Sequence, residues 1–254
     1  MEKNTSKTAI VILAAGLGTR MKSDMAKVLH KVGGKPMINH VLGTAAGLTT
    51  DNIIVVTGYQ SDRVREAANI CPGVRFALQE KQLGTGHAVL CAMPEVKDHI
   101  NNVVILCGDV PLLVSETVSS FINHHQQKDN VLTVLAVEVD NPTGYGRMIV
   151  DEKGMLIRIV EEADATASEK QIKIINSGIY CVERAFLDRA LNMLTPENAQ
   201  GELYLTDIIS IASSENRKIG LFIGQDADEV IGVNSVHDLA QAERILHHRQ
   251  GKTS

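Results

Sequence analysis

Residues 8–21 read TAIVILAAGLGTRM, and this stretch decides the fold prediction. Its first part, Thr8–Leu13, is a short run of mostly apolar, β-branched residues, which is typical of a strand buried on both faces. The run passes directly into a turn that contains Gly16 and Gly18. Small residues there let backbone amide groups approach a phosphate or a base that side chains would otherwise block. The stretch therefore predicts a buried first strand followed by a ligand-binding loop.

Strands of the same kind recur through the first half of the chain, separated by segments of helical length. We predict strands at Thr8–Leu13, Asn52–Thr57, Val74–Leu78 and Val103–Cys107, and helices at Pro36–Gly47, Ser61–Ala68, Gly86–Met93 and Ser115–His125. Ser61 is expected to cap its helix, and the pair His124-His125 is expected to be solvated. Strands that alternate with helices through short joints indicate a parallel sheet with right-handed crossovers.

The pattern changes after about residue 130, where strands follow one another without long helices between them. We predict these strands at Val131–Val137, Met148–Asp151, Leu156–Val160 and Ile174–Val182. A turn at Asp151–Gly154 predicts an antiparallel hairpin. Helices are expected at Arg184–Met193, Glu202–Ala212 and Val236–His248, the last capped by Ser235 and followed by a polar tail, with a strand at Lys218–Ile223. We expect one α/β domain over residues 1–254, with a mixed, mostly parallel sheet flanked by helices.

Composition and charge exclude several classes of protein. The chain has 254 residues, with 25 basic and 30 acidic side chains, a net charge of −5 and no tryptophan. A nucleic-acid binder normally needs a basic stripe and stacking rings, so no nucleic-acid partner is expected. The longest apolar run, Ala9–Ala15, is far shorter than the roughly 20 residues that span a bilayer, so no membrane partner is expected. The four cysteines are widely spaced, which favours a reduced, cytoplasmic protein.

The glycine loop almost fits two familiar nucleotide-binding motifs. A dinucleotide fingerprint needs a third glycine where Met21 stands, and a P-loop needs its second glycine at the same position. A nucleotide loop of another kind is therefore the better interpretation. Arg20 and Lys27 flank this loop at the carboxyl end of a strand, where α/β proteins bind ligands, so both can face a polyphosphate. Asp109 follows the strand Val103–Cys107 and is a candidate Mg²⁺ ligand, since that ion prefers oxygen donors.

The chain also resembles a known family over nearly its whole length. The blocks that carry the resemblance are Leu13–Met21, Lys27–His30, Gly34–Met37, Gln82–Ala88, Gly108–Leu112, Pro142–Arg147, Ile175–Ile179 and Gly232–Asn234. They are similar to the sugar-1-phosphate nucleotidyltransferases, and most of all to the uridylyltransferase half of bifunctional N-acetylglucosamine-1-phosphate uridyltransferases. The glycine signature alone marks only the superfamily, and the later blocks point to this branch.

The resemblance implies a Rossmann-like nucleotidyltransferase fold, a reaction and a set of site residues. The reaction is Mg²⁺-dependent transfer of UMP from UTP to N-acetylglucosamine-1-phosphate, by direct in-line attack, giving UDP-N-acetylglucosamine, a precursor of peptidoglycan and lipopolysaccharide. Residues from about 1 to 135 would form the nucleotide-binding part and those from about 136 to 254 an antiparallel sugar-binding part. The matching residues are Arg20, Lys27 and Asp109 for catalysis; Leu13, Ala14, Ala15, Gly16, Gln79, Gly84 and Thr85 around the nucleotide; Gly146, Glu161 and Asn176 around the sugar; Cys107 and Gly108 elsewhere in the substrate site; and Asp109 with Asn234 for the metal.

Three positions depart from the pattern of this family. Ala26 stands where a proline usually precedes the lysine, Cys107 replaces a common tyrosine, and Ala163 replaces a lysine that usually follows the Glu161 block. Loss of the proline is expected to loosen the backbone that aims Lys27. The three replacements bear on substrate preference and turnover more than on the class of reaction.

Several alternatives remain open at the level of the sequence. The chain could use another nucleoside triphosphate or sugar-1-phosphate, it could be a catalytically silent sugar-nucleotide sensor, or, less consistently with Met21, it could be a redox dinucleotide enzyme. The left-handed β-helix of the bifunctional relatives, with its hexapeptide repeats, does not occur in the chain, so no acetyltransferase activity is expected. A monomer or a weak homo-oligomer is expected for the same reason.

Overall fold

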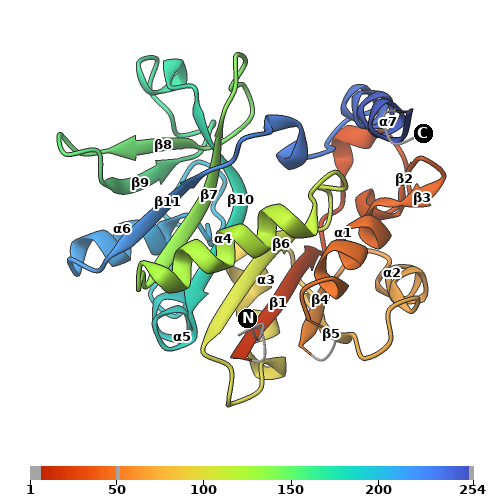
Figure 1. The fold of residues 1–254 in the computed structure, drawn as a ribbon, viewed down its shortest axis with the longest axis horizontal. Helices are drawn as coiled ribbons and strands as arrows, with labels where there is room; N and C mark the ends of the chain where they lie inside the picture. Colours follow the sequence, from red (N-terminus) through yellow and green to blue (C-terminus); the bar gives the residue numbers. More distant parts are fainter. Residues whose placement is uncertain (1–6, 50–51, 252–254) are drawn as a thin grey trace.

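A twisted sheet with helices on both faces forms the centre of the computed structural model, which describes residues 7–49 and 52–251 (Figure 1). The strands of the sheet are β1 (Thr8–Ala14), β4 (Ile53–Thr57), β5 (Arg75–Leu78), β6 (Asn102–Cys107), β7 (Leu132–Glu138), β8 (Arg147–Val150), β9 (Leu156–Val160), β10 (Ile174–Glu183) and β11 (Ile219–Ile223), and a separate small ribbon pairs β2 (Lys31–Val32) with β3 (Lys35–Pro36). The helices are α1 (Met37–Ala46), α2 (Ser61–Ala68), α3 (Thr85–Ala92), α4 (Ser115–Gln127), α5 (Arg184–Leu191), α6 (Asp207–Ser214) and α7 (Val236–Gly251).

Seven strands of the sheet form one continuous path, which is parallel except for one strand. Its order is β11-β7-β10-β6-β1-β4-β5, and β1 pairs in parallel with both β4 and β6. Strand β10 runs antiparallel between β6 and β7. The mixed, mostly parallel sheet expected from the sequence is therefore confirmed.

Helices cover the two faces of the sheet in sets of three. Alternate residues of β1 point to opposite faces, as the period of a strand requires. Val11 packs in one cluster with residues of α3, α5 and α6, whereas Ile10 and Ile12 pack in another with residues of α1, α2 and α4. Since both faces are covered, β1 is apolar at every position from Ala9 to Leu13.

The carboxyl ends of the parallel strands meet at one edge of the sheet. Ala14 at the end of β1 pairs with Thr57 at the end of β4, and Thr57 pairs with Leu78 at the end of β5. Cys107 at the end of β6 pairs with Leu13. The residues that follow these strands are thereby brought together. Because β10 is antiparallel, its amino end lies at the same edge.

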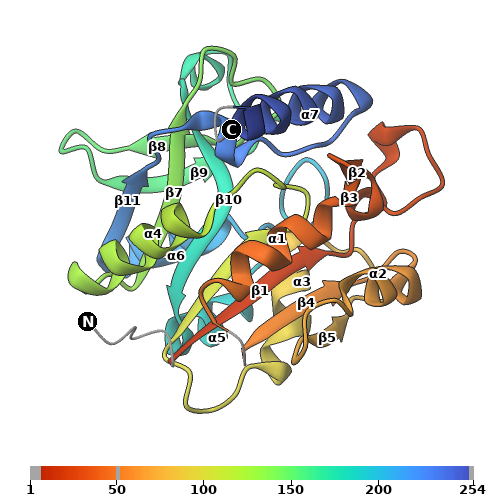
Figure 2. The ribbon, with the colours of Figure 1, turned by 45° about the vertical axis from the view of Figure 1, so that its right-hand side comes forward.

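Two smaller units stand beside this edge. The antiparallel hairpin β8–β9 is connected through Asp151–Gly154, as predicted, and joins β10 through one pairing of Arg147 with Ile175. Helix α7 lies beside the β2–β3 ribbon, as both views show (Figure 2). A third apolar cluster, which includes Met21, Val32, Val233 and Ala242, attaches this helix to the glycine loop.

The structure corrects several predicted elements. The helix expected at Glu202–Ala212 begins only at Asp207, because the backbone of Leu203 pairs instead with Leu83 and Gly86 (2.8 Å each). Ser61 does not cap α2, since its hydroxyl contacts the Thr57 hydroxyl and the Arg65 guanidinium.

Two further corrections concern α4 and α7. His125 is buried rather than solvated. The last helix reaches Gly251, so the first half of the polar tail predicted after His248 is helical, and residues 252–254 lie outside the described residues. The predicted cap of this helix is confirmed, because the Ser235 hydroxyl accepts a hydrogen bond from the Asp238 amide (3.2 Å).

Candidate active site

The glycine loop after β1 turns back over the segment that carries Lys27. Gly18 has φ = 71°, and a Cβ atom placed on it would lie only 2.6 Å from Cβ of Lys27. Position 18 therefore needs glycine for its conformation and for the close approach of Lys27. Lys27 itself begins a short 3₁₀ turn, Lys27–Leu29, which anchors Val28 and Leu29 in the core.

One pocket at the carboxyl edge gathers most of the predicted nucleotide-site residues. From the predicted set it is lined by Leu13, Ala14, Ala15, Gly16, Lys27, Gln79, Gly84, Thr85, Cys107 and Asp109. Gln82 and Glu202, which the sequence analysis did not single out, also line it. Of the remaining predictions, Gly108 is not among the lining residues, but its backbone amide donates to the carbonyl of Leu13, which is one of them (2.9 Å).

Gln79 is buried in this pocket and its amide is held from two sides. The Nε2 group donates to the Gly84 carbonyl at 3.0 Å and to Nδ1 of His87 at 3.1 Å. Both amide hydrogens are thereby used, and the Oε1 atom is left to accept a hydrogen bond from a ligand. Gly84 has φ = 106°, and a Cβ there would meet the Leu203 carbonyl at 2.6 Å, so this position is also restricted to glycine.

Cationic and oxygen-bearing side chains converge beside the pocket. The Lys27 ammonium forms an ion pair with Asp109 and donates to Oδ1 of Asn234 (3.1 Å). The same Asn234 oxygen accepts a hydrogen bond from Arg20 (2.9 Å). The four residues predicted for phosphate and metal binding are therefore in contact, although they come from three distant parts of the chain.

The oxygens of Asp109 and Asn234 suit a Mg²⁺ ion. Both atoms bond to one lysine nitrogen, which places them within reach of a single cation. Mg²⁺ typically takes one or two protein oxygens and completes its shell with phosphate oxygens and water. Within the described residues, no group of three or more His, Cys, Asp or Glu side chains is arranged to hold a metal ion.

Asn234 is positioned by the start of α7. Oδ2 of Asp238 accepts hydrogen bonds from the backbone amides of Asn234 and Ser235 (3.0 and 2.9 Å), which forms a reciprocal cap with Ser235. The Val233 amide donates to the Asp109 carbonyl (2.9 Å). Asp238 thus connects the helix cap to Asn234, a role that no motif in the sequence indicated.

The three residues predicted for the sugar lie together next to the hairpin. The backbone amide of Asn176 donates to the Gly146 carbonyl (2.9 Å). A Cβ atom placed on Gly146 would lie 3.4 Å from both Asn176 Cβ and Glu161 Oε1. The Asn176 side chain donates to the Tyr180 hydroxyl (2.7 Å). Burial raises the pKa of the Glu161 carboxyl above its usual value, and Asp164 and Asp207 add to the rise. The cluster therefore presents hydrogen-bonding groups with close backbone access at Gly146.

Glu162 supports the loop that leads to Gly146. Its Oε2 atom accepts from the Gly144 amide (3.2 Å) and from the guanidinium of Arg147 (2.7 Å), whose side chain is only 1% exposed. A buried guanidinium needs such a partner because its charge is otherwise uncompensated. No motif in the sequence indicated this role for Glu162.

The three residues that depart from the family pattern have different surroundings in the structure. The Ala26 amide donates to Oε1 of Gln60 (3.1 Å), a hydrogen bond that proline could not make. Burial, with a further contribution from Asp109, raises the pKa of the Cys107 thiol to about 12, so this thiol stays protonated and is a poor nucleophile. Ala163 is exposed.

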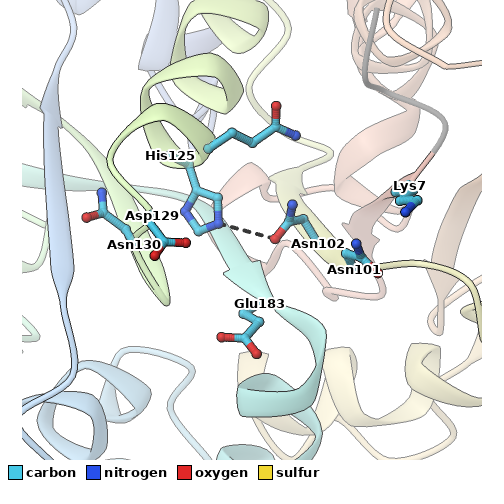
Figure 3. Close-up of a pocket in the computed structure, with 8 residues that line it drawn as sticks. Lys7, Asn101, Asn102, His125, Asp129, Asn130 and Glu183 are labelled. Carbon is cyan, nitrogen blue, oxygen red and sulfur yellow. Dashed lines mark hydrogen bonds between the residues drawn. The ribbon is translucent and has the colours of Figure 1, made fainter.

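A second pocket lies at the opposite edge of the sheet (Figure 3). His125 is held there by the Thr133 hydroxyl (2.8 Å) and by Oδ1 of Asn102 (3.3 Å). Burial lowers the pKa of His125 to about 4, so its ring is neutral near pH 7. The His125 ring, which is part of α4, therefore connects this helix to β7 through Thr133 and to β6 through Asn102. We assign this pocket a structural role.

Comparison with known proteins places the chain among nucleotide-transferring enzymes. The family model described as nucleotidyl transferase matches residues 9–243. The Bifunctional protein GlmU of Desulfotalea psychrophila is 47% identical over 252 residues, which are 98% of this chain and 74% of that protein. The protein of the same name from Geotalea uraniireducens is 47% identical over 244 residues, and the chain spans about half of its length (96% of this chain, 53% of that protein).

A solved structure shows the same fold. A protein of Bacillus anthracis assigned as a glucose-1-phosphate thymidylyltransferase superposes with a TM-score of 0.75 at 20% identity, over 94% of each chain. In the described part of this chain, no helix is both long and apolar enough to cross a membrane.

Proposed function

Since the chain belongs to the nucleotidyl transferase family, we propose that it transfers UMP from UTP to N-acetylglucosamine-1-phosphate. The products are UDP-N-acetylglucosamine and pyrophosphate, and we expect the chain to act in the cytoplasm as a monomer or weak homo-oligomer. The observation that carries the proposal is the contact among Arg20, Lys27, Asp109 and Asn234 beside a pocket lined by Gln79. This arrangement supports a polyphosphate with a metal ion next to a base-binding amide.

The site favours direct displacement over a covalent enzyme intermediate. An oxygen of the sugar phosphate attacks the α-phosphorus, the new P–O bond forms, and the bond to the β-phosphate oxygen breaks to release pyrophosphate. Such a reaction depends on positioning and charge neutralisation. Cys107 is the cysteine that lines the pocket, and its raised pKa of about 12 makes a thiolate nucleophile unfavourable.

Each group then has a defined task. Lys27 and Arg20 hold phosphate oxygens and neutralise their charge. Asp109 and Asn234 would hold Mg²⁺, which supplies further neutralisation on the phosphates when it is bound. Glu161, Asn176 and the Gly146 backbone would bind sugar hydroxyls or the acetamido group. Gln79 would read the base through its free Oε1 atom, as an acceptor for the N3–H group of uracil.

A substrate panel tests the proposal. Pyrophosphate release is measured with Mg²⁺ for UTP, CTP, dTTP, ATP and GTP, each crossed with several sugar-1-phosphates. Release that is restricted to UTP with N-acetylglucosamine-1-phosphate is expected. Release with another pair moves the base or sugar assignment. No release from folded protein that still binds nucleotide would favour a sensor.

A further inference from the structure

The amide of Gln79 can point in two ways, and the surrounding groups select one of them. Its two ends differ chemically, because Nε2 donates two hydrogen bonds and Oε1 only accepts. The Gly84 carbonyl, 3.0 Å from Nε2, can only accept, so it requires the nitrogen on its side. A single hydrogen bond leaves the amide plane free to swing, and a second contact is needed to fix it.

His87 supplies that second contact. Its Nδ1 atom lies 3.1 Å from Nε2 of Gln79, and it can accept the second amide hydrogen only if it carries no proton. The ring hydrogen is then on Nε2, which faces the Cys91 sulfur at 3.9 Å, a weak acceptor. The ring is carried by α3, whose start at Thr85 is held by a hydrogen bond from the Leu205 amide to the Thr85 hydroxyl (3.1 Å).

We propose that His87 is a positioning residue for base selection: it locks the Gln79 amide so that Oε1 faces the pocket as a hydrogen-bond acceptor. This inference rests on the proposed function and assigns the base preference to a residue that does not itself line the pocket. An acceptor at this point favours a base edge with a ring N–H donor, as in uracil, over one with an unprotonated ring nitrogen, as in cytosine. Without the lock, the amide can rotate and present its donor end to either base.

Two substitutions separate the acceptor from the volume of the ring. His87→Leu removes the acceptor, whereas His87→Asn can place an amide oxygen close to the position of Nδ1. We expect His87→Leu to lower the ratio of UTP to CTP binding affinity about tenfold, as loss of a buried hydrogen bond typically does. The change should appear in the KM for UTP, with kcat nearly unchanged, because the reacting phosphates are held elsewhere. His87→Asn is expected to restore most of the ratio.

Binding of UTP and of CTP is measured by calorimetry without a sugar substrate, on folded variants checked by thermal unfolding. Cys91→Ala is the matched control, since it alters the other side of the same ring and should leave the ratio unchanged. The double variant His87→Leu with Gln79→Ala should have the same ratio of UTP to CTP affinity as Gln79→Ala alone, because His87 acts through the Gln79 amide. Nitrogen NMR of His87 gives an independent readout, in which the tautomer with its ring hydrogen on Nε2 is expected.

The outcomes distinguish the two proposals. A wild-type chain that prefers UTP, together with a His87→Leu variant that keeps the same preference, overturns the role of His87 alone. A ring hydrogen found on Nδ1 also overturns the role of His87 alone. So does a Cys91→Ala variant that loses as much of the UTP-to-CTP affinity ratio as His87→Leu does. A wild-type chain that binds UTP and CTP equally overturns both this inference and the uridine specificity of the proposed function.

Discussion

Lys27 occupies the point at which the phosphate and metal functions meet. Its ammonium lies between Asp109 and Asn234, the two side chains whose oxygens suit Mg²⁺. A lysine and a magnesium ion are both cations, so they compete for the same two oxygens. We therefore propose that a metal ion held by Asp109 and Asn234 would displace Lys27 from Asp109 toward the phosphates. Movement of this one side chain would then couple metal binding to nucleotide binding.

Asp109→Ala should abolish Mg²⁺-dependent turnover while the fold is kept. The change removes the charged member of the proposed pair of metal ligands, and we expect turnover to fall at least about a hundredfold, the usual cost of losing a charge-stabilising group. The hydrogen bond from the Val233 amide goes to the Asp109 backbone carbonyl and survives the substitution. Pyrophosphate release measures the loss, and thermal unfolding checks the fold. Near-normal turnover would mean that the metal is held elsewhere.

Ala26 shows how a neighbouring side chain can compensate for a missing proline. Its φ of −53° is compatible with proline, and its amide donates to Gln60 Oε1. The sequence revealed the missing proline and predicted a looser backbone at this position. It could not reveal the hydrogen bond to Gln60, because that residue lies 34 positions away in the chain.

The Ala26–Gln60 pair gives a double-variant test. Ala26→Pro should change the free energy of unfolding by less than about 1 kcal/mol, because the lost hydrogen bond and the gained rigidity offset each other. Gln60→Ala should raise the KM for the nucleotide in the wild type and have a smaller effect in the Ala26→Pro background. Equal effects of Gln60→Ala in both backgrounds would show that this hydrogen bond does not position Lys27.

At the scale of elements, sequence patterns predicted most strands and helices and failed where tertiary contacts decide. The segment before α6 has a helical apolar pattern, yet the Leu203 backbone pairs with the loop that carries Gly84. That contact depends on folding of the whole sheet, so no local pattern reveals it. The sugar cluster likewise depends on β10 running antiparallel. Asn234 could be assigned only through the resemblance to a family.

Removal of Glu162 should weaken sugar binding selectively. Glu162→Ala leaves the buried Arg147 without its carboxylate and frees the Gly144 amide, so the loop that presents Gly146 loses its support. We expect the KM for the sugar phosphate to rise about tenfold and the KM for UTP to change little. Glu152→Ala, at the exposed turn of the same hairpin, is the control and should leave both unchanged. Equal increases in both constants would contradict a role confined to the sugar loop.

His125 should make stability depend on pH, because it joins α4 to β6 and β7. Its pKa falls from 6.5 to about 4 on folding, so the unfolded chain binds the proton first as the pH drops. The free energy of unfolding should therefore decrease between about pH 6.5 and pH 4, by roughly 3 kcal/mol in all. Urea unfolding across this range tests it against His125→Gln, which should show a shallower dependence. His247→Gln, at an exposed position of α7, should keep the wild-type slope, and a matching loss of slope there would contradict the assignment.

At the scale of the molecule, one sheet runs through both parts expected from the sequence. Strand β10, from the sugar-binding part, is inserted between β6 and β7, and it covers the hydrogen-bonding edge of β6. The apolar cluster on one face contains residues of every strand of this sheet, from both expected parts of the chain. The expected boundary near residue 135 falls within β7. We therefore propose that the two parts are functional regions of one folding unit.

The chain should accordingly unfold in a single cooperative transition. If the two parts were separate domains, each would have its own core, and their unfolding would be resolved. Here removal of β10 exposes the edge of β6 and uncovers Val103 and Ile105, so residues 1–135 alone should not fold. Calorimetry should give a van't Hoff enthalpy close to the measured enthalpy, and hydrogen exchange should show peptides of β4 and β9 opening together under denaturant. Two resolved transitions, or a folded 1–135 fragment, would show instead that the nucleotide-binding part is an independent domain.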